Sequence, residues 1–330
     1  MQINVSVVMP VYNEERYISH CIETLLEQDY PKEQMEWIFV DGMSKDRTVE
    51  IIGHFHQRYP DLIKVLRNPK KTVPYAMNIG IADAVGAYII RLDAHADYAD
   101  DYISKCVHYL DTIDADNVGG VAETKANGYM GNCIAKMLSS RFGVGNSEFR
   151  TNGESGYVDT VPFGAFRREV FERWGGYDER LTRNQDNEMN YRIRKNGGKI
   201  YLANDIHLSY YCRDTVKGIM KMALQNGTWN VITMYLCPGS MGIRHFVPLA
   251  FVLSLIVLPI ISMVLPWVGW LMACELVAYL GLDAVFSCKL DKGARERVTL
   301  FFLFPCFHIA YGIGSIRGLI KLLSRDFKRN

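Results

Sequence analysis

Short apolar runs alternate with stretches of helical periodicity over residues 1–240 of the chain. The apolar runs predict strands at residues 5–9, 36–40, 62–66 and 87–92. Between them, apolar residues recur with the period of a helix, which predicts helices at residues 15–28, 47–57 and 74–84. Strands that alternate with helices of this length predict an α/β fold, in which a mostly parallel sheet is wrapped by helices.

The C-terminal part of the chain has a different pattern, because residues 246–274 contain no charged side chain. About 20 apolar residues in a row are enough to cross a bilayer. The run is interrupted at Pro266-Trp267, where we expect a tight turn. The pattern predicts two spanning helices, then a spanning or re-entrant segment, then a basic amphipathic helix, at residues 246–265, 267–288, 298–316 and 317–329.

Basic residues gather in two places in this region, the loop after the second apolar segment and the C-terminal tail. They are Lys289, Lys292, Arg295 and Arg297, and then Arg317, Lys321, Arg325, Lys328 and Arg329. Loops rich in Lys and Arg stay on the cytoplasmic side of a membrane. We therefore expect a cytoplasmic domain at residues 1–240 and a membrane region at residues 241–330. A full third span would place the basic tail outside, which favours a re-entrant third segment.

Composition excludes several classes of protein. The formal net charge is +1 and the pI is about 7.6, so nothing indicates a nucleic-acid partner. The eight cysteines are scattered without a CxxC pair, which argues against a disulfide framework and a structural zinc site. The N-terminal NVSVVMPVY is strand-like and is not expected to be a signal peptide. The oligomeric state stays open, a homo-oligomer included.

Polar side chains follow three of the predicted strands, at the sheet edge where α/β proteins bind ligands. The residues expected there are Pro10, Tyr12, Glu14, Asp41, Asp93 and His95. The ring of Tyr12 suits stacking on a base, and the Asp41 carboxylate can accept the imide N–H of uracil. Asp46 precedes a predicted helix and is interpreted as its N-cap.

Four segments, read together, resemble the successive signatures of glycosyltransferase family 2. They begin VVMPVYNEE, WIFVDGMSK, NIGIADAVG and PFGAFRREV, at residues 7–28, 37–52, 78–98 and 162–202. The resemblance covers about residues 4–230 and implies a GT-A fold, a single nucleotide-binding α/β domain. The Asp-Ala-His-Ala and Asn-Gln-Asp-Asn-Glu runs and the apolar C-terminus look most like the succinoglycan-type glucosyltransferases, which build bacterial exopolysaccharide on a lipid carrier.

The resemblance implies that Asp93 and His95 bind a divalent cation, Mg²⁺ or Mn²⁺, that bridges the nucleotide diphosphate. The family has a second acid where this chain has His95, and Mn²⁺ tolerates imidazole more readily than Mg²⁺ does. Three options stay open: His95 is a ligand, Asp97 replaces it, or Asp93 binds through water or contacts the ribose. The family also has a second acid and a glycine where this chain has Gly42 and Met43, so only Asp41 is carried over there.

The same resemblance implies that Asp186 is the general base of an inverting transfer, taking the proton of the acceptor hydroxyl as it attacks the anomeric carbon. Taken alone, Asp186 is equally well an N-cap of the helix that follows it. Phe163, Gly164, Gln185 and Glu188 are expected to line the donor sugar or the acceptor, although Phe163 and Gly164 also suit a packed strand end. Gln225 and Trp229 resemble the Gln-x-x-Arg-Trp motif of processive synthases, but Thr228 replaces the arginine, which favours transfer of a single sugar.

The sequence thus predicts an enzyme, a glycosyltransferase attached to the cytoplasmic membrane. It is expected to move a sugar from a nucleotide sugar, a UDP-sugar by preference, to a lipid-linked saccharide. The alternatives are transfer to a polyprenyl phosphate, a nucleotidyltransferase and a non-catalytic membrane scaffold. A nucleotidyltransferase usually has a glycine-rich loop after its first strand, and residues 10–14 contain no glycine.

Overall fold

The computed structural model describes residues 2–151 and 153–324. The chain folds into two compact units, each assembled from two stretches. Over the described residues, the first consists of 2–123 and 153–211, and the second of 124–151 and 212–324. The expected cut between residues 240 and 241 lies inside the second unit, because helices that precede it pack with the C-terminal ones.

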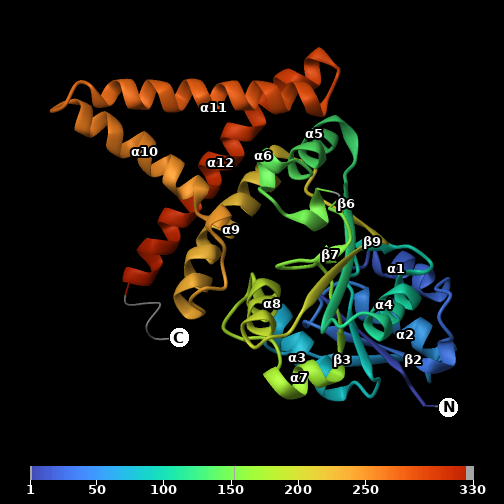
Figure 1. Ribbon diagram of the computed structural model, residues 1–330. Helices are drawn as coiled ribbons and strands as arrows, with labels where there is room; N and C mark the ends of the chain where they lie inside the picture. The colour runs from blue at the N-terminus through green and yellow to red at the C-terminus, as the bar shows by residue number, and fades with distance from the viewer. Residues whose placement is uncertain (1, 152, 325–330) are drawn as a thin grey trace. The chain divides into compact units, whose positions relative to one another are not determined.

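The first unit contains a nine-stranded sheet in the order β3-β2-β1-β4-β8-β6-β9-β5, with β7 paired to β9 (Figure 1). The strands are β1 Val5–Val11, β2 Met35–Asp41, β3 Ile63–Arg67, β4 Tyr88–Arg91, β5 Ala96–Tyr98, β6 Asn117–Lys125, β7 Gly156–Tyr157, β8 Ala165–Arg167 and β9 Ile200–Tyr211. β1 and β2 are buried almost throughout, as the continuous apolar runs of a central parallel strand require.

The first four strands are parallel and are joined by helices. The helices are α1 Ile18–Leu26, α2 Thr48–Arg58 and α3 Val73–Asp83, and a 3-10 turn, η1, spans Lys32–Gln34. Right-handed crossovers place α1 and α2 on one face and α3 on the other (Figure 1). All seven predicted elements are confirmed. Asp46, however, lies one residue before the N-cap, which is Arg47, although its carboxylate accepts the N–H of Thr48 at 3.0 Å.

The other half of the sheet is antiparallel in the pairs β4–β8, β6–β8, β5–β9 and β7–β9. The sheet is therefore mixed rather than mostly parallel. The remaining helices of this unit are α4 Tyr102–Thr112, α7 Arg168–Trp174 and α8 Gln185–Lys195.

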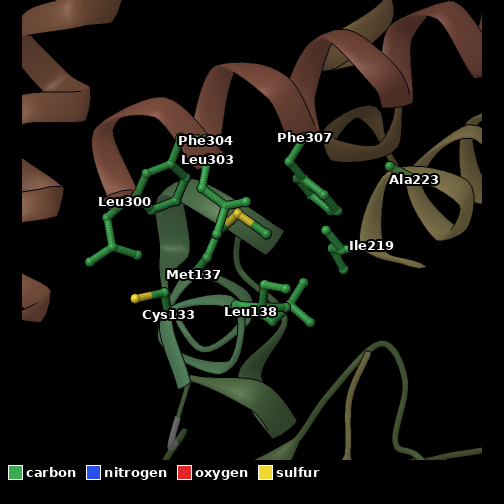
Figure 2. Packing of buried hydrophobic residues seen from close by; sticks show 10 residues of the cluster. Cys133, Met137, Leu138, Ile219, Ala223, Leu300, Leu303, Phe304 and Phe307 are labelled. Carbon is green, nitrogen blue, oxygen red and sulfur yellow. The ribbon is translucent and has the colours of Figure 1, made fainter. Parts of the chain in front are cut away.

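The second unit is helical. Its elements are α5 Gly128–Leu138, α6 Arg141–Val144, η2 Glu148–Arg150, α9 Val216–Leu236, η3 Ile243–His245, α10 Val247–Ser262, α11 Val268–Leu290 and α12 Ala294–Leu323. Apolar residues of α5, α9 and α12 form one buried cluster (Figure 2). Its members are Cys133, Ile134, Met137, Leu138, Ile219, Ala223, Leu300, Leu303, Phe304 and Phe307.

Helices α11 and α12 are long and apolar enough to cross a membrane, and α10 is a shorter apolar helix. The 16 residues of α10 rise about 24 Å, less than the roughly 30 Å of a bilayer core. The segments predicted at 298–316 and 317–329 share one helix as far as they are described, because α12 runs on to Leu323. Residues 325–329 of the predicted basic helix lie outside the described residues.

Two glycines of α12 lie in its contact with α9, where the absence of side chains lets the two helix backbones approach closely. A Cβ atom on Gly314 would overlap the Leu224 carbonyl oxygen, and one on Gly318 would lie 2.6 Å from that of Thr228. The Thr228 hydroxyl, buried in this contact, donates to the Gly314 carbonyl at 2.9 Å. Thr228, which replaces the arginine of the Gln-x-x-Arg-Trp motif, therefore belongs to the contact between α9 and α12.

Candidate active site

A buried arginine, Arg91, lies at the last position of β4 and joins two carboxylates. Its Nη1 donates to Oδ1 of Asp186, and its Nη2 lies 3.4 Å from Oδ1 of Asp93. The guanidinium also stands over the Phe163 ring, 5.9 Å from the ring centroid. Burial disfavours the charged guanidinium, but the two carboxylates outweigh it and raise the pKa of Arg91 well above its ordinary value. The cluster is therefore an ionic one.

Asp186 lies in the first turn of α8, where the helix dipole favours a negative charge. The N-cap is Asn184, and its φ of 62° lies in the left-handed region. The interpretation of Asp186 as an N-cap is therefore wrong. Its side chain is 37% exposed, and Arg91 is its one hydrogen-bond partner within the described residues. The Asp186 carboxylate thus combines one hydrogen bond, from Arg91 to Oδ1, with partial exposure to solvent.

A small pocket lies beside Asp186 in the first unit. Its lining residues are Asn117, Val161, Gly164, Phe166, Tyr177, Asp186, Met189 and Asn190. Tyr177 is buried, and this burial, strengthened by the nearby Asp186 carboxylate, raises the pKa of its phenol. The nearby Arg91 guanidinium acts on this pKa in the opposite direction but does not outweigh burial. The phenol is therefore a neutral group beside the Arg91–Asp186 pair.

Asp93 follows β4 in a turn that Tyr98 fixes. The N–H of Asp93 donates to the Tyr98 hydroxyl at 2.8 Å, and that hydroxyl lies 3.3 Å from the Asp93 carbonyl oxygen. Nδ1 of His95 lies 3.5 Å from Oε1 of Glu14. The loops that follow β1 and β4 thus meet at this pair, as the shared sheet edge predicts.

Asp97, the alternative to His95 as a ligand, has other partners. Its Oδ2 accepts a hydrogen bond from Tyr211 at 2.9 Å, and its Oδ1 lies 3.4 Å from His20. Over the described residues, no group of three or more His, Cys, Asp and Glu side chains is placed to hold a metal ion. A cation here would therefore take few ligands from the protein, and Asp93 and His95 remain the predicted ones.

The predicted nucleotide end is built from the turns after β1 and β2. Pro10 lies in β1 beyond its pairing with β4, so its missing N–H leaves no gap in that ladder. Tyr12 is 46% exposed, with its ring free to receive a flat ligand face. Asp41 is buried, and its carboxylate accepts the N–H groups of Met43 and Ser44 at 3.1 Å. The Asp41 carboxylate therefore stabilises the turn that follows β2, and this takes up part of its capacity to accept hydrogen bonds.

The residues predicted to line the sugar or the acceptor fall into two groups. The Gly164 carbonyl accepts the N–H of Arg91 at 3.1 Å, so Phe163 and Gly164 belong to the Arg91 cluster. Gln185 is buried, and its Oε1 has no partner within the described residues. Glu188 instead holds Arg192, at 2.9 and 2.8 Å. Both oxygens of Glu188 are therefore engaged in a salt bridge along α8.

Strained backbone marks the same region. Within the described residues, five other than glycine have positive φ: Asn13, Met43, Lys71, Phe163 and Asn184. Phe163 is itself a predicted site residue, and Asn13, Met43 and Asn184 lie within two positions of one. Such conformations cost about 1–3 kcal/mol each and gather at functional sites. These conformations therefore occur in the same turns as the predicted site residues, which stay a prediction.

The sequence prediction missed Arg91, Tyr98 and Tyr177. Arg91 had a detectable signal, because a charged residue ends a buried apolar strand, and buried arginines are rare unless paired. The two tyrosines had none, because their roles depend on distant segments that the fold brings together.

The family model for glycosyl transferase family 2 matches residues 6–175. This chain belongs to glycosyltransferase family 2. The match contains the turns after β1, β2 and β4 as well as Phe163 and Gly164, and Asp186 lies beyond it. Membership in this family gives the nucleotidyltransferase and scaffold alternatives no support.

Two curated relatives extend the similarity beyond the family model. The glycosyltransferase is 30% identical over 329 residues to a Methanococcus voltae protein, named dolichyl N-acetyl-alpha-D-glucosaminyl phosphate 3-beta-D-2,3-diacetamido-2,3-dideoxy-beta-D-glucuronosyltransferase. That match covers 96% of this chain and 97% of the relative. This chain is also 29% identical over 246 residues to the succinoglycan biosynthesis protein ExoA of Rhizobium meliloti, and that match covers 74% of each chain.

Solved structures show the fold of this glycosyltransferase. The mannosyltransferase PcManGT from Pyrobaculum calidifontis, solved with GDP-Man and Mn²⁺, has a TM-score of 0.63 at 18% identity, over 97% of this chain and 88% of that one. Residues 1–349 of S. aureus TarS, solved with UDP, have a TM-score of 0.51 at 15% identity, over 97% and 92%. The fold is therefore GT-A-like, with apolar helices at the C-terminus that are candidate membrane spans.

Proposed function

We propose that this glycosyltransferase moves a single sugar from a UDP-sugar to a lipid-linked saccharide, with inversion at the anomeric carbon. The observation that carries the proposal is the Asp186 carboxylate, anchored through one oxygen by Arg91 and 37% exposed. Such a carboxylate suits a general base, because it is fixed in place and still reachable by a hydroxyl.

The reaction exchanges one bond for another. The acceptor oxygen forms a bond to the anomeric carbon while its proton passes to Asp186. The bond from that carbon to the diphosphate oxygen breaks on the opposite face, and the nucleoside diphosphate leaves with the bonding pair. Attack opposite the leaving group inverts the configuration, and no covalent enzyme intermediate is needed.

Asp93 and His95 are the residues that would hold a divalent cation. A carboxylate and an imidazole suit Mn²⁺, and they suit Mg²⁺ less well. When bound, the cation neutralises the charge that grows on the leaving diphosphate. We expect His95→Ala to raise the Mn²⁺ concentration that gives half-maximal activity. An unchanged Mn²⁺ dependence in that variant would remove His95 from the site.

A lipid-linked acceptor is supported by the relatives and by the second unit. The name of the Methanococcus relative describes a dolichyl-linked sugar phosphate as its acceptor. The α10 and α11 helices expose large apolar side chains, among them Val257, Ile260, Trp270 and Val277. These faces support attachment of the chain to a membrane, and we propose its cytoplasmic side. An acceptor confined to that membrane meets the enzyme at a raised effective concentration.

The test is a panel of UDP-glucose, UDP-N-acetylglucosamine and UDP-glucuronic acid, incubated with a lipid extract and the full chain in membranes. UDP release and the anomeric configuration of the product are measured. Asp186→Asn is expected to lower kcat by about 10²-fold or more. A retained configuration would overturn the inverting mechanism. Full activity of Asp186→Asn would favour polyprenyl phosphate as the acceptor, since a phosphate is already ionised and needs little help from a base.

A further inference from the structure

The guanidinium of Arg91 connects the two halves of the candidate site. It is 5% exposed and reaches a carboxylate from each side, Asp186 on α8 and Asp93 after β4. These two residues are far apart in the chain, and Arg91 is the group that both contact. An arginine presents its N–H donors in a rigid planar fork, so contacts to two of its nitrogens fix where the two carboxylates lie relative to each other.

The surroundings of Arg91 hold the fork in place. Its backbone N–H donates to the Gly164 carbonyl at 3.1 Å, and its guanidinium lies over the Phe163 ring at 5.9 Å. Phe163 itself has a φ of 45°, a conformation that a bulky residue adopts only when its neighbours impose it. Its carbonyl accepts a hydrogen bond from the buried Tyr102 at 3.2 Å. The arginine therefore has little freedom to leave the carboxylates.

The Asp186 side chain is 37% exposed, so solvent reaches it despite this contact. The carboxylate binds Arg91 through Oδ1, which leaves Oδ2 for a hydroxyl that approaches from solvent. A base that could rotate would present either oxygen in many directions. Catalysis by a positioned base loses about 10²-fold when the geometry slips by roughly 1 Å.

We propose that Arg91 is a positioning residue, which orients the Asp186 base and, through Asp93, links the placement of that base to the donor side. This inference rests on the proposed role of Asp186. It assigns to Arg91 no contact with the substrate. The expected signature is therefore a loss of kcat with little change in the binding of UDP.

The experiment compares Arg91→Ala with the intact chain, both full-length and in membranes. UDP release from the donor panel gives kcat, and titration with UDP gives its affinity. We expect kcat to fall by about 10²-fold and the UDP affinity to change by less than about threefold. Guanidinium ion at about 50 mM is well below denaturing concentrations. It should raise the rate of the Arg91→Ala variant by about tenfold or more, because it can enter the vacated space and bind Asp186.

Arg168→Ala is the matched control. Arg168 is also a partly buried arginine next to β8, but its guanidinium donates to the backbone carbonyls of Ala84 and Gly86. A purely structural loss would be shared by both variants and would not respond to guanidinium. If Arg91→Ala does not fold, as judged by circular dichroism, Arg91→Lys replaces it. That variant keeps the charge without the fork and should retain UDP affinity with a lowered kcat.

Two results would overturn the proposal. One is a loss of UDP affinity with unchanged kcat, which would make Arg91 a donor contact. The other is a folded Arg91→Ala whose rate guanidinium does not raise. Asp186→Asn separates this failure from that of the proposed function. An inactive Asp186→Asn beside a fully active Arg91→Ala would remove only the role of Arg91, whereas a fully active Asp186→Asn would remove both.

Discussion

The Asn117 side chain on β6 donates a hydrogen bond to Oδ1 of Asn190 on α8 at 2.7 Å. Asn190 in turn donates to the Thr160 hydroxyl at 2.7 Å, and all three residues are buried. This short network ties the helix that carries Asp186 to the sheet. The position of the Asp186 carboxylate thus depends on the buried amide groups of Asn117 and Asn190.

Asn190→Ala should therefore lower activity, although it leaves the Asp186 carboxylate and Arg91 in place. The change leaves Asn117 and Thr160 short of a partner, which destabilises the fold by about 1–3 kcal/mol. It also frees the start of α8, so we expect kcat to fall by about tenfold or more. UDP release in membranes measures the effect. Arg194→Ala, an exposed change on the same helix, should leave kcat unchanged, and an equal loss in both variants would refute the link.

A second buried polar group, Glu36 on β2, should make stability depend on pH. Its carboxylate accepts the Ser6 hydroxyl at 2.5 Å and the Val85 N–H at 2.7 Å, and it pairs with Lys64 at 2.7 Å. Burial raises the pKa of Glu36, but the bond to Lys64 and the other hydrogen bonds outweigh it, so the pKa lies below its ordinary value. Stability from this group is present above the unfolded-state pKa of about 4.3 and is lost as pH falls through the folded-state pKa.

Glu36→Gln should therefore destabilise the chain by about 1.5–3 kcal/mol near pH 7, and the difference from the intact protein should shrink below about pH 4. Thermal unfolding in detergent at several pH values measures this. Glu50→Gln removes the partner of Arg47 in an exposed pair and should change little at any pH. A Glu36→Gln effect of the same size at low and neutral pH would contradict the assignment.

The elements of the parallel half of the sheet could be predicted because their signals are local. The apolar run of β2 and the periodicity of α1 each lie within a few turns of chain. The position of Asp41 and Asp93 at one edge of the sheet could also be predicted, since they lie at the carboxyl ends of two of its parallel strands. The resemblance to family 2 added Asp186, for which local pattern alone equally allowed an N-cap.

The remaining features depend on contacts between distant segments. The partner of Arg91 could not be predicted from the local pattern, because α8 brings Asp186 to it from 95 residues further along the chain. The antiparallel half of the sheet is made of strands as short as β7, whose two residues carry no periodicity. The length of α12 could not be predicted for the same reason, because Gly314 resembles a helix breaker until α9 is placed against it.

The contact between α9 and α12 gives a prediction about Gly314. A Cβ atom there would overlap the Leu224 carbonyl oxygen, and backbone cannot move aside as a flexible side chain can. Gly314→Ala should separate the helices and destabilise the second unit by about 1–3 kcal/mol. A Cβ atom on Gly281 of α11 would meet no atom of the described residues within 4 Å, so Gly281→Ala is the control. Thermal unfolding in one detergent compares them, and equal melting temperatures would refute the close contact.

Native cysteines can test whether α11 is embedded in a membrane. Cys274 and Cys288 are both exposed on this helix. Cys288 neighbours Lys289 at the C-terminal end of α11, whereas Cys274 neighbours Glu275, whose carboxylate accepts the Ser254 hydroxyl of α10 at 2.6 Å. A lysine at the end of a span favours the interface, so Cys288 should face water and Cys274 should face lipid. A membrane-impermeant maleimide applied to open membrane sheets should therefore modify Cys288 and spare Cys274.

Mass spectrometry of the digested chain measures both modifications, and detergent should make Cys274 reactive. Cys21 is the internal control for folding. Burial, with the carboxylates of Asp97, Asp93 and Glu14 nearby, raises the pKa of the Cys21 thiol to about 12, so its thiolate is scarce and it should stay unmodified while the first unit is folded. Equal labelling of Cys274 and Cys288 in intact membranes would mean that α11 lies in water, and the membrane assignment of this helix would then fail.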